Sequence, residues 1–233
     1  MIGGEVTVQE ELFETLAQVA RALGSGPRLA ILVRLAQAEA SVEKIAETVG
    51  LTIANTSQHL QQLRRSGLVT ANRAGKQMIY RMTDERIISL MEMMRNIAES
   101  NIAEMERLVS QLFSYDDAGG ELLPVTITEL RDGLDKAEVT LIDVRPTDEY
   151  VSGHLPGALN VQLDELESLL DTLPKDKEIV AYCRGPYCAL SHKAVEVLLK
   201  QGYKVRRFKD GYPEWKAAGL PISKTVDSVT ADL

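Results

Sequence analysis

The chain has only two cysteines among its 233 residues, Cys183 and Cys188, and they lie close together. Two cysteines are too few for a disulfide framework like those of small secreted domains. We therefore expect these thiols to be reactive rather than structural. No apolar run approaches the ~20 residues of a membrane-spanning helix, and the N-terminal segment lacks the basic and then apolar pattern of a signal peptide. We therefore expect a cytoplasmic protein without a membrane partner.

Acidic residues are missing from one window of an otherwise acidic chain. The formal net charge is −8, yet residues 51–83 contain no Asp or Glu and carry Arg64, Arg65, Arg73, Lys76 and Arg81. A basic window in an acidic chain is typical of a surface that binds a polyanion. A solvated surface that merely lacks acids is the alternative.

The length predicts two domains, since one domain commonly takes roughly 100 to 150 residues. A polar break containing Asp116-Asp117, Gly119-Gly120 and Pro124 marks the boundary. The expected parts are a first domain (1–113), a linker (114–123), a second domain (124–222) and a C-terminal tail (223–233).

The first domain is predicted to be mainly helical. Apolar spacing favours helices over 8–22 and 28–38, a third from the N-cap Ser41 to Gly50, and a fourth over 52–66. Strands over 68–70 and 78–82 would flank a basic tip at 72–76. A helix, a turn, a second helix and a basic β-hairpin together predict a winged helix-turn-helix, whose second helix enters the major groove of double-stranded DNA.

The fourth helix carries small and amide side chains, which bond to base edges and phosphates. With the basic residues of the helix end and the wing, the expected DNA-binding residues are Asn55, Thr56, Ser57, Gln58, His59, Gln61, Gln62, Arg64, Arg65, Arg73, Lys76 and Arg81.

The motifs Ser57-Gln58-His59-Leu60, Ser66-Gly67-Leu68-Val69 and Tyr80-Arg81 resemble the ArsR/SmtB family of dimeric winged-helix repressors, over about residues 8–112. Many members of that family sense metals through cysteines, or through histidines and carboxylates. Residues 1–112 contain no Cys and a single His, so we expect no metal site and no cofactor here. His59 is instead expected to face DNA or to pack within its helix.

Residues 84–113 are predicted to form one long helix with a seven-residue apolar repeat. Such a seam suits pairing with a second copy in a homodimer, with Asn101 fixing the register; packing against its own domain is the alternative. The expected seam consists of Ile87, Met91, Met94, Ala98, Asn101, Met105, Leu108 and Leu112.

The second domain is predicted to be α/β with a mostly parallel sheet. Expected strands at 139–144, 178–182 and 205–208 alternate with helices at 163–170 and 189–201. In such sheets the chemistry lies at the carboxyl ends of the strands, and Cys183 directly follows one.

Three motifs in order, 143–146, 153–160 and Gly211-Tyr212-Pro213-Glu214-Trp215, together with Cys183 after its strand, resemble the rhodanese domain over roughly residues 122–222. A loop between a strand end and a helix N-terminus aims backbone N–H groups and the helix dipole at one point. There Cys183 would be a thiolate that attacks sulfane sulfur and holds it as a persulfide. It is the expected catalytic residue.

The loop after Cys183 has some residues that favour binding of an anion and others that differ from those of common rhodaneses. Arg184 is expected to add positive charge and Gly185 to allow tight curvature, whereas Pro186 lacks an N–H donor and Tyr187 is bulky. Ala189 stands where a Cys-x5-Arg phosphatase or arsenate-reductase loop would carry its arginine, so phosphoryl chemistry lacks its clamp.

Cys188 places a second sulfur in this loop. The two sulfurs can form a disulfide or a polysulfur bridge if their Cα atoms lie within about 7 Å, which would make Cys188 a resolving thiol. A small loop hydrophobe is the alternative.

Other polar residues near the loop are expected to be mainly structural. Arg145 and Glu149 are expected to pair with each other, His154 to hold its loop, and Asp143 to support the strand end, with pocket or catalytic roles as the alternative. His192 is expected at the surface or in packing.

Three functions are consistent with this sequence. The first is a DNA-binding repressor that senses reactive sulfur or oxidant through Cys183. The alternative is an active thiosulfate or polysulfide sulfurtransferase whose DNA-binding domain regulates or localises it, and Pro186 and Tyr187 leave a degenerate ligand pocket as a third. The expected partners are operator DNA, a second copy of the chain, and polysulfide, thiosulfate or a low-molecular-weight persulfide.

Overall fold

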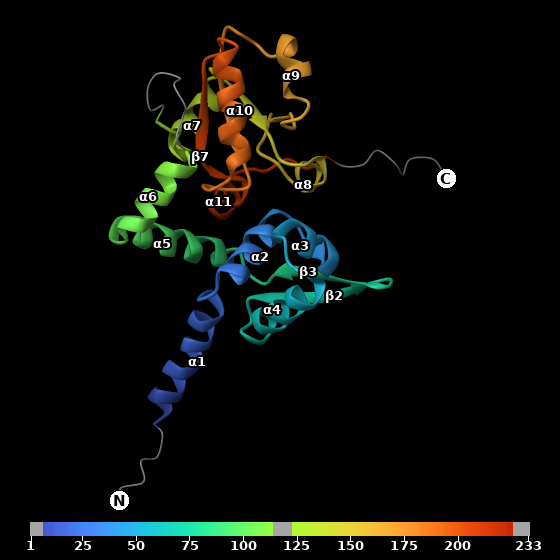
Figure 1. Ribbon diagram of the computed structural model, residues 1–233, viewed down its shortest axis with the longest axis vertical. Coiled ribbons are helices and arrows are strands. Elements are labelled where there is room, and N and C mark those ends of the chain that lie inside the picture. The colour runs from blue at the N-terminus through green and yellow to red at the C-terminus, as the bar shows by residue number, and fades with distance from the viewer. Residues whose placement is uncertain (1–6, 114–122, 226–233) are drawn as a thin grey trace, which may run out of the picture. The chain divides into compact units, whose positions relative to one another are not determined.

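The computed structural model describes residues 7–113 and 123–225 and divides into two units, Met1–Ile87 and Ile88–Leu233 (Figure 1). The division falls inside helix α5 (Arg86–Asn101), which contributes residues to both units. Almost all of the expected linker 114–123, and the tail beyond residue 225, lie outside the described residues.

The helices of the first unit follow the predicted ones closely: α1 (Val8–Leu23), α2 (Gly26–Gln37), α3 (Val42–Val49) and α4 (Ile53–Arg65). Side-chain caps set the starts of three of them, because Thr7 accepts the Glu10 N–H, Ser41 accepts the Lys44 N–H and Thr52 accepts the Asn55 N–H. Gly50 ends α3 with a φ of 68°, a left-handed conformation that glycine adopts without strain. Local capping chemistry thus delimits the helix-turn-helix.

The wing is longer than the sequence predicts. Strands β2 (Val69–Ala74) and β3 (Gln77–Met82) pair antiparallel, and β1 (Ala40–Ser41) pairs with β3 on its other side. The pairing runs from Val69↔Met82 to Ala74↔Gln77, so only Gly75 and Lys76 form the turn. Gly75 has a φ of 60°, as a two-residue hairpin turn requires.

The predicted single helix over 84–113 is wrong, because the structure has two helices, α5 and α6 (Ala103–Leu112). Ile102 lies between them in an extended conformation. The Asn101 side-chain amide donates to the Ile97 carbonyl at 2.8 Å, a local bond of the kind that competes with helical backbone bonds. Ile87 is buried, so the expected seam loses both its continuity and its first member.

The second unit contains a parallel four-stranded sheet in the order β5–β4–β6–β7. The strands are β4 (Val139–Asp143), β5 (Leu159–Asn160), β6 (Glu178–Cys183) and β7 (Val205–Gly211). The predicted α/β architecture is confirmed, although the two-residue β5 is too short for the sequence pattern to reveal.

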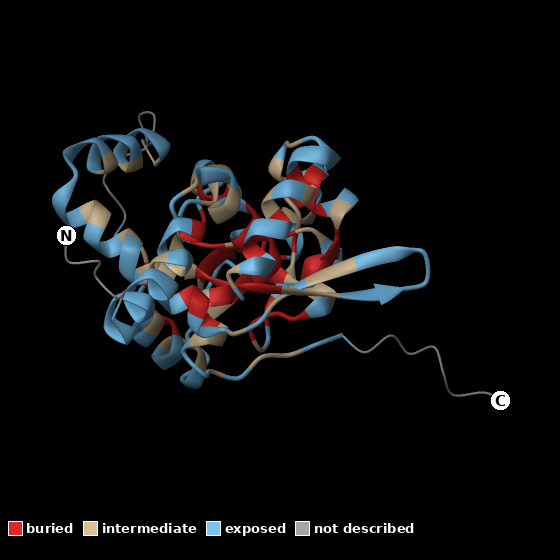
Figure 2. Cartoon of the chain, turned by 90° about the horizontal axis from the view of Figure 1, so that it is seen from below, coloured by how far each residue is buried: buried red, intermediate tan, exposed pale blue. Residues whose placement is uncertain are grey.

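Helices cover both faces of this sheet: α7 (Ile127–Asp135), α8 (Thr147–Ser152), α9 (Leu166–Leu169) with a 3-10 turn (Leu170–Thr172), α10 (Ala189–Lys200) and α11 (Tyr212–Ala217). Alternation along β6 directs Cys183 into the core that includes Val195 and Leu198 of α10. Tyr182 faces the opposite core with Phe208 and Trp215. The buried residues, red in Figure 2, lie mainly on the strands and on the helix faces packed against them.

None of the helices in the described part of the chain is long and apolar enough to span a membrane.

Candidate cysteine site and nucleic-acid interface

Helix α4 exposes most of the polar residues expected to face DNA. Asn55, Gln58, Gln61, Arg64 and Arg65 are exposed, and Ser57 and His59 are partly exposed. Gln62 is exposed too, but it accepts a hydrogen bond from Arg28 of α2.

The prediction that Thr56 binds DNA is wrong, because this residue is fully buried. Its hydroxyl donates to the Thr52 carbonyl one turn earlier at 2.9 Å, which satisfies the hydroxyl inside the helix. Thr56 therefore supports the first turn of α4 and does not face DNA.

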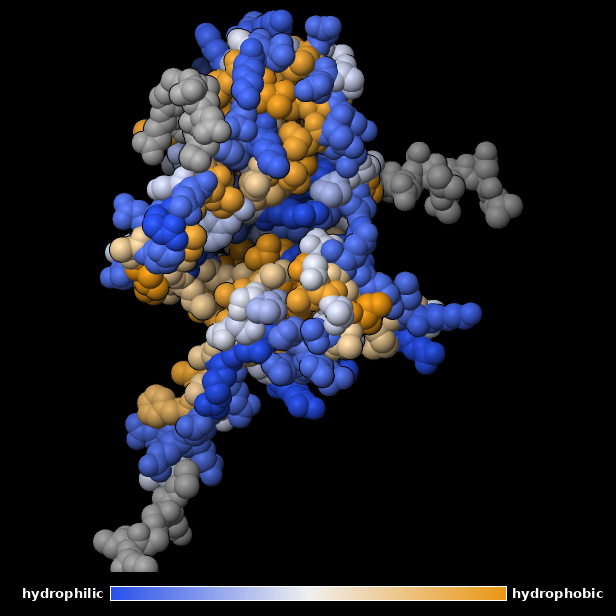
Figure 3. Space-filling view, in the orientation of Figure 1, coloured by the Kyte–Doolittle hydropathy of each residue, from blue (hydrophilic) through white to orange (hydrophobic). Residues whose placement is uncertain are grey.

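The wing exposes Arg73, Lys76 and Arg81. The hairpin is hydrophilic at its tip, on the right of Figure 3. Within the described residues, no carboxylate forms an ion pair with these three side chains or with Arg64 and Arg65. Their positive charge is thus available to a polyanion.

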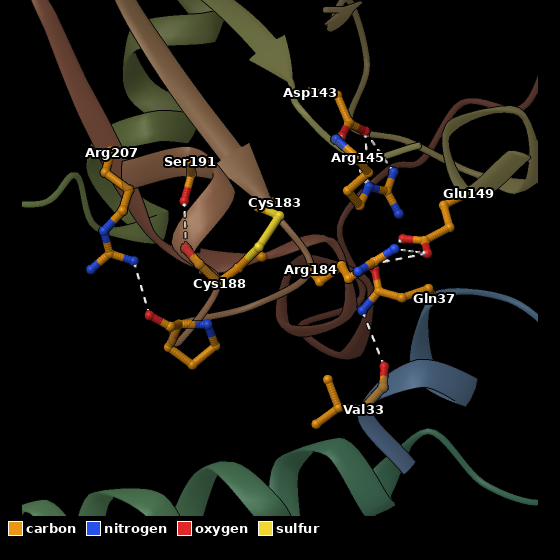
Figure 4. Close-up of a disulfide and its surroundings, with 12 residues drawn as sticks. Val33, Gln37, Asp143, Arg145, Glu149, Cys183, Arg184, Cys188, Ser191 and Arg207 are labelled. Atoms are coloured by element: carbon orange, nitrogen blue, oxygen red, sulfur yellow. Dashed lines mark hydrogen bonds and ion pairs between the residues drawn. A yellow bond between two sulfur atoms is a disulfide. The ribbon is translucent and has the colours of Figure 1, made fainter. Parts of the chain in front are cut away.

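The cysteine site is a short loop between β6 and α10. Cys183 ends the strand and is 1% exposed, whereas Cys188 is the partly exposed N-cap residue of α10. The two residues form a disulfide with a Cα–Cα distance of 6.2 Å, inside the limit set out above (Figure 4). The loop between them can therefore exist in a bridged form.

Backbone contacts hold this loop tightly. Gly185 has a φ of 156°, and its carbonyl accepts the Cys188 N–H at 3.1 Å. A Cβ atom on Gly211 would overlap the backbone of Arg184 and Gly185, so β7 and the loop meet backbone to backbone. Gly185 was expected to allow curvature; Gly211 was noted only as part of a motif, and its spatial partner was missed.

Arg184 does not leave a free positive charge at the loop. Its Nε lies 2.9 and 3.0 Å from the two carboxylate oxygens of Glu149, and its Nη2 lies 2.7 Å from one of them. Glu149 is buried, so the fork-shaped pair lies at the edge of the domain interior. The expected charge contribution of Arg184 to the loop is wrong.

Arg145 pairs with Asp143 rather than with Glu149. Both side chains are fully buried and their closest atoms lie 2.6 Å apart. The Arg145 guanidinium also donates to the Gly153 carbonyl at 2.7 Å and lies 4.4 Å from the centre of the Tyr212 ring. These contacts join Asp143 and Arg145 to each other and to Gly153 and Tyr212 in the interior of the domain.

Glu214 is a titratable group beside the loop. Burial raises the pKa of its carboxyl to about 7, and nearby Asp210 acts in the same direction. Its Oε2 accepts the Gly211 N–H at 3.0 Å, and its carboxylate oxygens lie 3.6 and 3.7 Å from the position of a Cβ on Gly185. In the sequence, Glu214 is recognisable only as part of the motif 211–215.

The two histidines of this unit take part in packing. The His154 Nδ1 lies 2.9 Å from the Tyr150 carbonyl, and its ring stacks on the Tyr150 ring. His192 is buried and meets the Phe113 ring edge-on at 5.5 Å. In the described parts of the chain, no group of three or more His, Cys, Asp or Glu side chains is placed to hold a metal ion.

Comparisons with known proteins agree with both halves. The model of the bacterial regulatory protein arsR family matches residues 26–71, and that of the rhodanese-like domain matches residues 126–218. The chain is 38% identical over 224 residues to the HTH-type transcriptional regulator Rv0324 of Mycobacterium tuberculosis, covering 96% of each chain. The chain belongs to the ArsR family of transcriptional regulators.

Two further relatives of this ArsR-family protein cover one half each. A sulfurtransferase of Allochromatium vinosum is 35% identical over 89 residues, which are 38% of this chain and 81% of that protein. The solved homodimeric winged helix-turn-helix DNA-binding domain of Mb0332, fragment 1–100, from Mycobacterium bovis is 35% identical with a TM-score of 0.39, covering 43% of this chain and 94% of that one. The two family matches place an arsR-family segment and a rhodanese-like domain in one chain.

Proposed function

We propose that this ArsR-family regulator changes its affinity for DNA when reactive sulfur or an oxidant acts on Cys183 and Cys188. The main observation that supports this proposal is the Cys183–Cys188 bridge in the loop between β6 and α10. The DNA-binding unit supplies no comparable group, since it contains no cysteine. The reactive pair and the DNA-reading surface are therefore supplied by different domains of one chain.

The proposed chemistry needs two steps. The Cys183 thiolate attacks the sulfane sulfur of a hydropolysulfide, forms Cys183–S–SH and releases the shortened polysulfide anion. The Cys188 thiolate then attacks the Cys183 sulfur, forms the disulfide and releases hydrosulfide, HS⁻. The two thiols are oxidised by two electrons, and the transferred sulfane sulfur is reduced to HS⁻.

We also propose that the regulator acts as a homodimer on operator DNA. Apolar side chains are exposed along α1 (Val8, Leu12, Phe13 and Leu16), as Figure 3 shows over that helix, and Met94, Leu108 and Leu112 of the expected seam are exposed as well. Exposed apolar surface of this kind favours association with a second copy.

The decisive test is the fluorescence anisotropy of the full chain on DNA from its own upstream region, before and after treatment with polysulfide at fixed salt. We expect the affinity of the wild-type protein to change at least about fivefold, in line with ordinary allosteric coupling. Cys183→Ser should abolish the change, while Cys188→Ser should load a persulfide, seen by intact mass, without forming the bridge. An equal response in Cys183→Ser would contradict the proposal.

A sulfurtransferase is the second candidate, favoured by the similarity to the Allochromatium vinosum enzyme. It predicts steady-state transfer from thiosulfate or polysulfide to a thiol above ~1 s⁻¹, near the low end of ordinary enzyme turnover. Such turnover would favour this function over sensing if the DNA affinity is also the same whether or not Cys183 carries sulfur.

The wing should contribute sequence-independent affinity. Arg73 and Lys76 are exposed, and neither forms an ion pair with a carboxylate of the described residues. Changing either to alanine should therefore weaken binding to all DNA sequences and lower the salt slope by about one. Binding titrations across a salt series measure this slope. Lys136→Ala, an exposed change in the rhodanese-like domain, is the matched control, and an unchanged slope in the wing variants would contradict this docking.

A further inference from the structure

Helix α5 contacts the cysteine loop through Tyr187. This tyrosine lies next to Cys188, is 40% exposed, and donates its hydroxyl to the carboxylate of Glu99 on α5. Partial burial and the bond to Glu99 raise the pKa of Tyr187, so its hydroxyl stays protonated and able to donate at neutral pH. Both residues belong to the second unit, and Glu99 lies outside the segment that matches the rhodanese-like family.

A second contact joins α5 to the same region. The Arg95 side chain is 10% exposed and lies 3.3 Å from the Asp210 carboxylate, which is also largely buried. Asp210 directly precedes Gly211, whose backbone lies against that of Gly185. An ion pair shielded from water in this way is screened less than an exposed one. Arg95 thus holds the strand end on which the cysteine loop rests.

The end of α6 makes a third contact. The Phe113 ring lies 4.2 Å from the Arg207 guanidinium, and Arg207 donates to the Pro186 carbonyl of the loop at 3.1 Å, as Figure 4 shows for the latter bond. Phe113 also meets His192 on α10, the helix that begins at the loop. Helix α5 therefore contacts the loop directly at Tyr187 and indirectly through Asp210, and the C-cap residue of α6 contacts it indirectly through Arg207.

We propose that Arg95 and Glu99 are positioning residues of the cysteine site, and that α5 transmits the state of the Cys183–Cys188 pair to the DNA-binding unit. This inference rests on the proposed function. Cys188 is tied to Cys183 in the bridged form and is released in the dithiol form, so its neighbour Tyr187 changes its contact with Glu99 between the two forms. Helix α5 runs without interruption from Arg86, and its buried residue Ile87 belongs to the first unit.

Linkage gives this coupling two measurable consequences. If the Tyr187–Glu99 bond differs between the bridged and dithiol forms, removing it shifts the equilibrium between those forms. The equilibrium is measured in a glutathione buffer, where two glutathione thiols reduce the bridge and leave as one glutathione disulfide. The same removal lowers the ratio of DNA affinities between the two forms.

The test uses Tyr187→Phe in the full chain, which removes the hydroxyl and keeps the ring. We expect the thiol–disulfide equilibrium constant to shift at least threefold, and the affinity ratio between bridged and reduced protein to fall at least threefold towards one. Tyr203→Phe is the matched control, because its hydroxyl bonds to the Leu170 carbonyl in the same domain and not to Glu99. Tyr203→Phe should leave both values unchanged.

A double-mutant cycle with Glu99→Ala shows whether the two residues act through their shared bond. We expect Tyr187→Phe with Glu99→Ala to shift the equilibrium no further than either single change, because both remove the same interaction. Additive shifts would overturn the assignment of Glu99 as the partner that positions the loop.

The outcomes separate this inference from the proposed function. An unchanged equilibrium and an unchanged affinity ratio in Tyr187→Phe, with a large ratio in the wild type, would overturn the role of α5 and leave sulfur sensing standing. A wild-type affinity ratio of one would overturn sensing and transmission together. A shifted equilibrium would then still support the positioning role of Glu99.

Discussion

Replacing Arg145 with alanine is expected to destabilise the rhodanese-like domain by about 3 to 5 kcal/mol, because the change leaves a buried carboxylate without its partner. Asp143 and Arg145 are both fully buried, and the guanidinium also satisfies the Gly153 carbonyl. Because the Asp143 side chain is 0% exposed, bulk water does not solvate its carboxylate in the wild-type chain. The loss is a large part of the 5 to 15 kcal/mol that usually stabilises a domain.

Urea denaturation of Arg145→Ala, followed by tryptophan fluorescence, measures this loss. Trp215, the only tryptophan, lies in the core of the rhodanese-like domain, so its emission reports on that domain. Arg131→Ala is the control, because the Arg131–Asp132 pair is about half exposed and such pairs contribute about 0 to 1 kcal/mol. Equal small losses in both variants would show that the Asp143–Arg145 pair is not structurally required.

Changing Gly211 to alanine is expected to slow formation of the Cys183–Cys188 bridge by at least about tenfold. The new methyl group would overlap the backbone of Arg184 and Gly185, so the loop must move to make room. A displacement of about 1 Å can lower a reaction rate by a factor of about 100. The effect should appear in the rate of bridge formation with polysulfide, measured by quenched intact mass.

Gly133→Ala is the matched control for the change at Gly211. Its methyl group would meet the Val139 side chain at 3.0 Å, which can adjust more easily than backbone. Unfolding curves for both variants establish that the domain remains folded under the assay conditions. A wild-type rate of bridge formation in folded Gly211→Ala would contradict the close packing of β7 against the loop.

Local signals in the sequence predicted the DNA-binding unit well. Ser41, Gly50 and Thr52 act on their own helix ends, so their neighbours along the chain are enough to place the boundaries. Thr56 was misplaced because a polar residue type does not reveal on which face of a helix it lies. Its bond to the Thr52 carbonyl is possible only in the formed helix.

The break between α5 and α6 shows the limit of periodicity. The seven-residue apolar pattern continues across Ile102, although the helix does not. Asn101 was a usable signal, because its side chain can bond to its own backbone. The predicted role of Asn101 in fixing the register of a helix pair assumes an unbroken helix, which the structure does not have.

Chain order predicts the position of the cysteine loop correctly, whereas the predicted pairing of Arg145 with Glu149 is wrong. Arg145, Glu149 and Arg184 each had more than one possible partner of opposite charge. Only the fold selects Asp143 for Arg145 and Glu149 for Arg184. The contacts of Gly211 with the loop and of Glu99 with Tyr187 join segments far apart in sequence, and one sequence carries no signal for them.

The most direct measurement is the thiol–disulfide equilibrium of the Cys183–Cys188 pair in a glutathione buffer, with and without saturating operator DNA. Coupling between two sites is reciprocal, so DNA must shift this equilibrium by the same factor by which the bridge changes DNA affinity. We expect a shift of at least about fivefold, or about 1 kcal/mol. An equilibrium constant that is the same with and without DNA would contradict sulfur sensing by this regulator.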